Sequence, residues 1–452
     1  MMLNQNTTQL KSKSLLHRFT NSCIHLFERY LPDPLVVVVI LTVIVLTAGI
    51  VLEGQSPSAM LEYWMGGFWK LHTFAMQMIL VLVAGHIVAT TPFFMRLVGM
   101  IAGKAKTPGQ AIVLVTLVSL LASWVNWGIG LVVGAILSKA LAKQVKGVDY
   151  RLLIASAYSG FLLWHAGLSG SVPLSLATDG HPVEALTGVI PTTSTLFSTF
   201  NLVLVAVLLF AIPLTNYLLM KQIDQPFELE EKDRPLEQAA QVNRQAMTPA
   251  ERLEHANWPS TLICLLGFAA LVVYVANGGG LNLNIVIFVL LFAGIALHKN
   301  LHSFLAHLNQ AVRGASGVII QFPFYAGVMG MMSQSGLASD LAQFFVNISN
   351  ADTLPLWGFL SAGLINLFIP SGGGQWAVQG PVLMEAAQVL NADMARVAMA
   401  FAWGDSWTNM LQPFWALPAL AIAGLKARDI MGYCAIVLLV SGGLIGLMLL
   451  LI

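Results

Sequence analysis

Long apolar stretches separated by short polar segments dominate this chain of 452 residues. They cover residues 35–52, 112–137, 202–220, 285–297 and 430–452. Most approach or exceed the ~20 residues that an α-helix needs to cross ~30 Å of hydrocarbon. They lack the alternation of polar and apolar side chains that is typical of membrane β-barrels. The pattern therefore predicts an all-α polytopic membrane protein.

Composition supports this prediction and excludes other classes. Hydrophobic residues make up 57% of the chain and charged residues only 10%, against about 25% charged in soluble domains. The net charge of +1 and the lack of phosphate-loop or zinc-ligand spacings predict no nucleic-acid partner and no cofactor. Cys23, Cys264 and Cys434 are odd in number and far apart, which argues against a disulfide framework.

The basic residues predict the orientation in the membrane. All Lys and Arg residues except Lys70 and Arg396 lie in the N-terminal arm or in segments 96–106, 139–151, 221–252, 299–313 and 426–428. The positive-inside rule places these segments and the N-terminus in the cytoplasm. It places the base-free segments near 53–62, 178–190, 277–282, 335–353 and 385–392 outside.

Two apolar segments begin and end on the same predicted side of the membrane. Residues 110–138 lie between basic segments, and residues 354–385 lie between base-free segments. Each is therefore predicted to be a re-entrant hairpin, and the two enter from opposite sides. The apolar segments that follow, 151–177 and 393–424, are interrupted by Gly, Ser, Asn and Pro, which predicts a broken transmembrane helix after each hairpin.

These elements predict two inverted five-element repeats, residues 33–220 and 282–452, each with a re-entrant hairpin and a broken helix. An N-terminal arm with an interfacial helix, 1–32, precedes them. A cytoplasmic loop, 221–257, and one extra transmembrane helix, 258–276, join them. An odd number of crossings between the repeats inverts the second, and a shift of 240 residues places His165 on Asp405.

The broken segments and hairpin tips are predicted to form a substrate site. Gly-rich turns and helix N-termini present free backbone amides that suit an anion. Stretches 164–173 and 403–418 hold no Lys or Arg, which favours a small monocarboxylate. The predicted binding residues are Asn126, Gly128, Gly130, Ser169, Ser171, Asn366, Ser371, Gly372, Gly373, Gly374, Gln375 and Gln379. Close helix packing is the alternative reading for the glycines.

Tryptophans near these positions are candidates to wall off a short alkyl chain. They are Trp127, Trp164, Trp376 and Trp403. Packing or anchoring at the membrane interface is the alternative role for each of them.

Two ionisable residues inside apolar segments are candidates for ion coupling. Asp405 is expensive to bury in a bilayer and is a functional candidate for that reason. It can carry a proton or bind Na⁺, with Thr408 and Asn409 as neutral partners. His165 can accept a proton near neutral pH. The alternatives are a structural carboxylate capped by nearby hydroxyl groups and a neutral, hydrogen-bonded histidine.

Several motifs resemble the bacterial short-chain fatty acid transporter family, the type that takes up acetoacetate and butyrate. They are PDP near residue 33, VNWGIGLVVGA, GLSGS, QFPFYAG, PSGGGQWAVQGP, and QPFWALPALAIAGL followed by RDIMGYC. The resemblance covers nearly the whole chain from about residue 20. It implies a multi-pass protein of the bacterial inner membrane that is not an enzyme. It also implies a secondary carrier for small monocarboxylates, with cation symport and an elevator-type motion as the expected mechanism.

Two alternatives from other classes stay open at this stage. One is an uncoupled carboxylate channel or facilitator, whose uptake would never concentrate substrate. The other is a membrane-embedded serine hydrolase, because Gly167-Leu168-Ser169-Gly170 resembles a GxSG motif with His165 and His181 nearby. The expected partners are a small carboxylate and the lipid bilayer, and a homodimer is compatible with the sequence.

Overall fold

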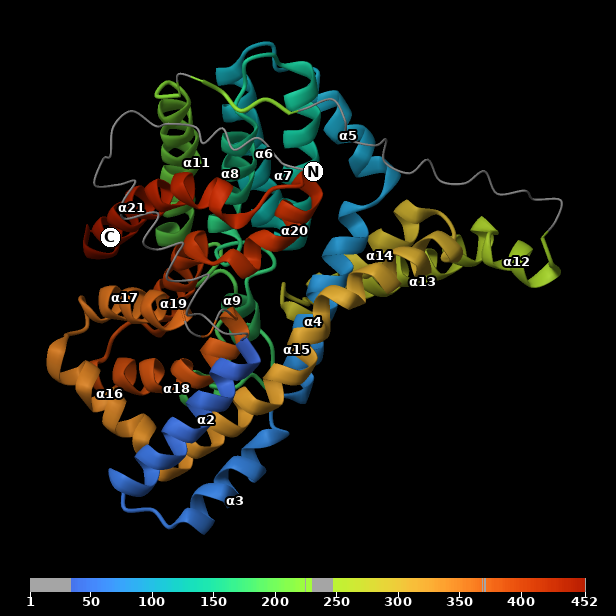
Figure 1. The fold of residues 1–452 in the computed structure, drawn as a ribbon. Helices are drawn as coiled ribbons and strands as arrows, with labels where there is room; N and C mark the ends of the chain where they lie inside the picture. Colours follow the sequence, from blue (N-terminus) through green and yellow to red (C-terminus); the bar gives the residue numbers. More distant parts are fainter. Residues whose placement is uncertain (1–33, 224, 230–246, 368, 370, 452) are drawn as a thin grey trace.

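The computed structural model describes residues 34–223, 225–229, 247–367, 369 and 371–451, and these residues contain helices but no strand (Figure 1). The predicted N-terminal arm and residues 230–246 of the predicted cytoplasmic loop lie outside the described residues. The prediction of an all-helical protein is confirmed for the described part of the chain.

The first part of the chain forms a series of helices with a distorted stretch in the middle. In order, they are α2 (Pro34–Val51), α3 (Pro57–Phe68), α4 (His72–Ala89), α5 (Pro92–Ala102), α6 (Pro108–Val125), α7 (Trp127–Gln144), α8 (Tyr150–Ser159), the 3₁₀ turn η1 (Gly160–Leu163), α9 (Ser171–Leu176), α10 (Glu184–Thr187) and α11 (Thr199–Met220). Local sequence sets several starts: Ser56, Thr91 and Thr107 each cap a helix whose first turn contains a proline.

The second part repeats several of these features. Its elements are α12 (Pro249–Glu254), α13 (Asn257–Ala276), α14 (Leu283–His298), α15 (Leu301–Ser335), α16 (Leu337–Ile348), α17 (Leu354–Asn366), α18 (Gly372–Leu390), α19 (Met394–Thr408), the 3₁₀ turn η3 (Asn409–Leu411), α20 (Pro413–Ala423) and α21 (Ala427–Leu451). Both parts contain a helix pair, an interrupted helix and a long final helix in the same order.

Two helices occupy segments that the charge pattern placed in outside loops. Helix α3 overlaps the segment 53–62, and α16 lies within 335–353. Helix α16 buries Leu337, Ala338, Ala342 and Phe345, which recur at helical spacing and form one apolar face. The basic residues report only on which side a segment lies, so they did not reveal these amphipathic helices.

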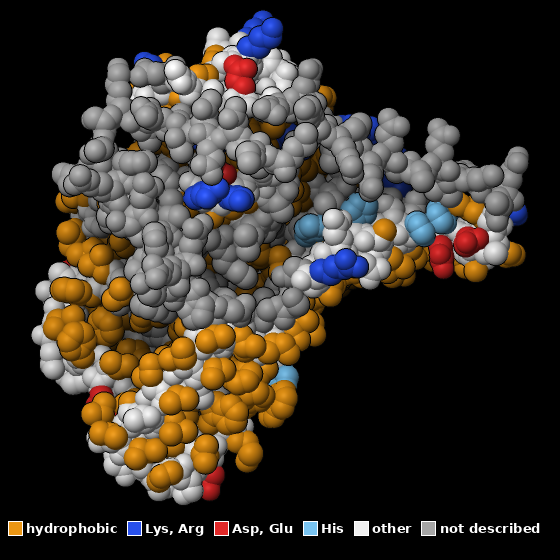
Figure 2. Space-filling view, viewed as in Figure 1, with side chains coloured by type: hydrophobic (Ala, Val, Ile, Leu, Met, Phe, Trp, Pro, Cys, Tyr) orange, Lys and Arg blue, Asp and Glu red, His pale blue; other side chains and the backbone are white. Residues whose placement is uncertain are grey.

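Five described helices, α4, α6, α11, α13 and α21, are long and apolar enough to cross a membrane. The apolar exterior agrees with this. Figure 2 shows hydrophobic side chains over the face of the molecule where α2 lies, and Val36, Val39, Ile40, Val43 and Ile44 of that helix are exposed. In a bilayer such side chains would contact lipid instead of water, so their position on the surface costs no hydrophobic free energy there.

The interrupted helices lie in the middle of the molecule. In Figure 1, α9, α17 and α19 lie between an upper group that contains α6, α7, α8, α11 and α21 and a lower group that contains α2, α16 and α18, while α12, α13 and α14 extend to one side. Helices α6 and α7 pack together as the first hairpin, and α17 and α18 as the second hairpin. We call residues 160–170 the first break and residues 409–412 the second break.

Candidate functional site

The first hairpin tip is held directly against the first break. The Leu168 amide donates to the Trp124 carbonyl at 2.7 Å, and the Trp127 amide donates to Ser169 Oγ at 3.1 Å. A Cβ on Gly167 would lie 2.0 Å from the Trp124 carbonyl oxygen, so only glycine allows this approach. Predicted site residue Ser169 therefore joins two parts of the same half of the chain.

The other predicted residues of the first hairpin serve the hairpin itself. Asn126 Oδ1 accepts from the amides of Gly128 and Ile129 at 3.0 and 3.1 Å and so caps α7. A Cβ on Gly130 would lie 1.9 Å from Ser123 Oγ, so this glycine lets α7 approach α6 closely. Of the two roles considered from the sequence for Gly130, substrate binding and close helix packing, the structure shows close packing.

The second hairpin tip is bonded to the second break in a more polar way. Asn366 Nδ2 donates to the Asp405 carbonyl at 2.9 Å, to Thr408 Oγ1 at 3.0 Å and to Asn409 Oδ1 at 2.7 Å. Gln412 Nε2 donates to the Asn366 carbonyl at 2.7 Å. The structure thus brings together Asn366, Asp405, Thr408 and Asn409, which were predicted separately as binding and coupling residues.

A hydrogen bond joins the two halves at the centre of the molecule. His165 Nδ1 lies 3.0 Å from Asp405 Oδ2, across 240 residues of sequence, and both residues are completely buried. The Val172 amide donates to His165 Nε2 at 3.1 Å, so Nε2 is an acceptor and Nδ1 carries the proton that is donated to Asp405. Ser171 Oγ lies 2.9 Å from the same Nε2.

Several buried oxygens around Asp405 have no hydrogen-bond partner among the described residues. They are Asp405 Oδ1, Asn366 Oδ1 and Gln412 Oε1. Unpaired buried acceptors cost free energy, so a native site that holds several needs an explanation such as a bound cation or a proton. All three belong to residues joined in one hydrogen-bond network.

The SGGG sequence lies beside this centre. Ser371 caps α18 by accepting from the Gly374 amide at 3.2 Å, whereas the first-turn amides of Gly372 and Gly373 have no carbonyl four residues earlier within the helix. A Cβ on Gly372 would lie 2.7 Å from His165 Cε1 and 3.0 Å from Ser171 Oγ. The second hairpin therefore presents backbone amides next to the histidine of the first half.

Other predicted residues lie away from this centre or are occupied within the hairpin. Gln375 Nε2 donates to the Ala362 carbonyl and to Gln379 Oε1, and Gln379 Nε2 donates to Ser361 Oγ, so both glutamines brace α18 against α17. Trp376 packs on Phe401.

The two candidate tryptophans of the first half, Trp127 and Trp164, lie near the centre. Trp164 stacks on the His165 ring with centroids 4.1 Å apart and on Phe161 at 5.6 Å, and Trp127 meets both Trp164 and Trp415 edge to face. Trp403 instead donates to Asn201 Oδ1 at 3.1 Å. Trp127 and Trp164 thus form an apolar wall on one side of the His165–Asp405 pair.

Sequence reasoning missed two polar residues that hold the second break in place, one from each half of the chain. Tyr158 Oη donates to the Asn409 carbonyl at 2.6 Å, and Gln412 reaches Asn366 from the other side of the second break. Both are polar side chains inside apolar segments, which was the criterion that selected Asp405. Applied to every polar residue in 151–177 and 393–424, the same criterion would have included them.

The geometry also bears on the hydrolase alternative. Ser169, the serine of the GxSG motif, accepts a hydrogen bond from the Trp127 amide. The serine within hydrogen-bond distance of His165 is Ser171 instead. Ser171, His165 and Asp405 have the connectivity of a serine hydrolase triad. However, His165 Nε2 also receives the Val172 amide, and Ser171 is only 2% exposed, so a peptide has no access to this serine.

The fold and this centre define a multi-pass helical membrane protein of the transporter class, with broken helices meeting two hairpin tips. A family model described as "Short chain fatty acid transporter" matches residues 15–452, and the chain belongs to this family.

Curated relatives agree with this assignment. A protein of Escherichia coli (strain K12), provisionally named a short-chain fatty acid transporter, is 43% identical over 95% of this chain and 98% of its own length. A protein of Haemophilus influenzae (strain ATCC 51907 / DSM 11121 / KW20 / Rd) with the same provisional name is 42% identical. That match covers 90% of this chain and 93% of the relative's own length.

A solved structure shares the fold. The crystal structure of the Alcanivorax borkumensis YdaH transporter, described as having an unusual topology, superposes with a TM-score of 0.55 and 17% identity. The match covers 92% of this chain and 98% of that protein. At this identity the comparison supports the architecture alone.

Proposed function

We propose that this protein is a secondary active transporter that carries short-chain fatty acids such as acetoacetate and butyrate, together with a cation, across the bacterial inner membrane. Family membership supports the substrate class. The observation that carries the coupling is the buried Asp405–His165 pair, which joins the two halves beside the first turn of α18 in the second hairpin. A simple pore has no evident need for a completely buried carboxylate at this junction.

The charge of this pair gives a physical reason for coupling. With His165 neutral and Asp405 ionised, the centre carries one negative charge. Two negative charges about 5 Å apart repel by about 3 kcal/mol at an effective dielectric constant of about 20. A carboxylate substrate on the Gly372 and Gly373 amides therefore binds about 100-fold more weakly until a cation neutralises Asp405. Substrate and cation then bind together, which is the requirement for symport.

The residues present fit either of two coupling ions. A proton can bind Asp405 Oδ1, which has no partner among the described residues. Na⁺ can be held by the oxygens of Asp405, Asn366 and Gln412, since unwound helices supply oxygen ligands for Na⁺ in transporters of this kind. Thr408 and Asn409, bonded to Asn366, hold this cluster in place in either case.

We infer that the two halves form inverted repeats and that transport uses an elevator-type motion, with the hairpins entering the membrane from opposite sides. The recurrence of helix pair, interrupted helix and long helix supports the repeat. The N-terminus and the basic segments are proposed to be cytoplasmic. A homodimer would supply a fixed scaffold for such a motion.

Uptake into liposomes tests this function. Purified protein is reconstituted, and uptake of radiolabelled acetoacetate and butyrate is measured under an inward proton gradient, an inward Na⁺ gradient, and neither. Protein-free liposomes must be subtracted, because the uncharged acids cross lipid unaided, and pH is kept well above the carboxylic acid pKa of about 4. Protein-dependent accumulation driven by one gradient is expected and identifies the ion. Equal, non-concentrative uptake in all three conditions would instead establish an uncoupled facilitator.

A further inference from the structure

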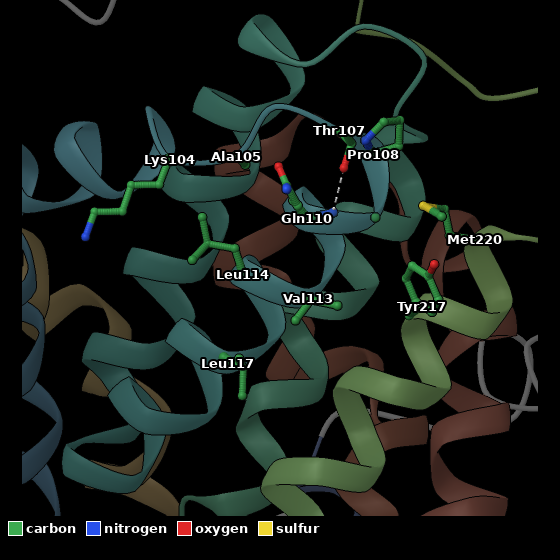
Figure 3. A pocket seen from close by; sticks show the side chains of 11 residues that line it. Lys104, Ala105, Thr107, Pro108, Gln110, Val113, Leu114, Leu117, Tyr217 and Met220 are labelled. Atoms are coloured by element: carbon green, nitrogen blue, oxygen red, sulfur yellow. Dashed lines mark hydrogen bonds between the residues drawn. The ribbon is translucent and has the colours of Figure 1, made fainter.

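A cavity lies far from the centre, between the start of α6 and the end of α11 (Figure 3). Its volume of about 690 Å³ falls within the roughly 300–1,000 Å³ typical of ligand pockets. Its walls come from the segment that leads into α6, from one face of α6, and from Tyr217 and Met220 of α11. None of its residues takes part in the proposed transport site.

The lining changes from polar to apolar along α6. Lys104, Thr107 and Gln110 lie at the end where α6 begins, whereas Val113, Leu114 and Leu117 follow along the helix (Figure 3). These three apolar side chains are partly exposed, so the cavity is an open groove. A molecule with a polar head and a long apolar tail matches this gradient.

The polar end of the groove is positively charged. Lys104 lines it, Lys106 lies two residues further on, and Lys221 Nζ lies 4.7 Å from the centroid of the Tyr217 ring, which forms the opposite wall. Within the described part of the chain, none of these three lysines forms an ion pair with a carboxylate. The charge at this end is thus available to an anionic group.

The position of the groove determines which molecule reaches it. Both α6 and α11 are long and apolar enough to cross a membrane, and their basic ends are predicted to lie at the cytoplasmic surface. A groove between two transmembrane helices is exposed to membrane lipid along its length, and basic pockets of this kind bind anionic head groups. The wall from Thr107 to Leu117 follows about three turns of α6, roughly 15 Å. A short-chain fatty acid has the charge, but with its carboxylate at the basic end its few carbons would not reach the apolar side chains at Val113 to Leu117.

We propose that this groove binds an anionic phospholipid of the cytoplasmic leaflet, with its head group at the basic end near Lys104 and Lys221 and an acyl chain along Val113, Leu114 and Leu117. Charge complementarity selects the head group, and the apolar face of α6 retains the tail. The bound lipid would fill the space between α6, an arm of the first hairpin, and α11. This proposal is independent of the substrate and the coupling ion.

Native mass spectrometry of the delipidated full-length protein in detergent tests the proposal. The protein is titrated with dioleoyl phosphatidylglycerol and, separately, with dioleoyl phosphatidylcholine. Lys104→Gln combined with Lys221→Gln should weaken phosphatidylglycerol binding about tenfold or more, because two positive charges at the basic end of the groove are lost. The pair Lys143→Gln and Lys146→Gln removes the same charge from the same predicted side and should leave binding unchanged. Val113→Trp, which fills the groove, should weaken binding while leaving both lysines in place.

Four results would overturn the proposal. Equal affinity for phosphatidylglycerol and phosphatidylcholine would remove the head-group selection. Equal losses in the two lysine pairs would show a general effect of surface charge. Displacement of the lipid by inorganic phosphate or by butyrate at the same concentration would show that the tail contributes nothing and that the groove binds a small anion. Melting temperatures of all variants establish that each is folded, and a Val113→Trp protein that binds phosphatidylglycerol normally also contradicts the proposed tail position.

Discussion

The two hairpin tips contact their breaks with very different chemistry. At the first, Asn126 caps its own helix and Ser169 accepts one backbone amide. At the second, Asn366 Nδ2 lies within hydrogen-bond distance of three oxygens of residues 405–409, and Asp405 is held by a histidine from the other half. The first contact is neutral, while the second holds a carboxylate and unpartnered oxygens. From this difference we infer, as part of the proposed function, that ion coupling resides at the second tip and that the first tip has mainly a structural role.

The largest effect is expected from Asp405→Asn. The variant keeps the shape of the side chain but removes the charge that a cation must neutralise, so gradient-driven accumulation should be lost while exchange of labelled for unlabelled butyrate continues. Uptake and counterflow in liposomes measure the two activities. Asp393→Asn is the matched control, because Asp393 caps the same helix and asparagine caps equally well. Normal accumulation by Asp405→Asn would exclude this residue from coupling.

Adding one methyl group to each hairpin gives the next comparison. In Gly372→Ala, the new Cβ would lie 2.7 Å from His165 Cε1, and overpacking of about 1–3 kcal/mol should reduce uptake about 5- to 150-fold. In Gly128→Ala, the nearest atom is Asn126 Oδ1 at 3.3 Å, so uptake should fall little. Initial rates, corrected for the amount of folded protein, provide the measurement. A larger loss from the first hairpin variant would reverse the assignment of roles.

The two serines near the first break should differ more modestly. Ser171→Ala removes one hydrogen bond to His165 Nε2, and a bond worth about 1 kcal/mol predicts an uptake rate about fivefold lower with an altered pH profile. Ser169→Ala removes the acceptor of the Trp127 amide and should lower thermal stability with the pH profile unchanged. Uptake measured from pH 6 to 8.5 distinguishes them. Identical profiles in both variants would separate Ser171 from the coupling pair.

The smallest effect is expected from Asn126→Ala. Loss of the cap of α7 should lower stability by about 1 kcal/mol, seen as a lower melting temperature in detergent, with substrate affinity unchanged. Asn126→Ser, which keeps a capping oxygen, should recover most of the loss. A marked change in the Km for butyrate would show that Asn126 contacts substrate after all.

The sequence predicted the helical class, the interruptions and most residues of the centre by simple rules. A carboxylate in an apolar segment and a run of glycines next to proline are visible without a structure. The hydrogen bonds of Asn126, Ser169 and Gln375 were not predictable, because a polar residue in a break can equally face a ligand, cap a helix or brace a neighbour. Spacing along the chain does not distinguish these outcomes.

The contact between the two halves was also not predictable from the sequence. A shift of 240 residues paired His165 with Asp405 as equivalent positions, but equivalence in a repeat does not require contact. Their hydrogen bond depends on how the two breaks meet, and on Tyr158 and Gln412, which hold the second break in position. Such long-range geometry is set by the packing of the whole bundle.

The His165–Asp405 bond also has a consequence for how the protein is made. Its partners are 240 residues apart, and at ~5–20 residues per second a ribosome needs about 12–48 s to go from one to the other. Throughout that interval the first half is already entering the membrane with its buried histidine lacking the carboxylate. The first half is therefore expected to wait in an incompletely closed state, a target for membrane proteases, until the end of the chain arrives.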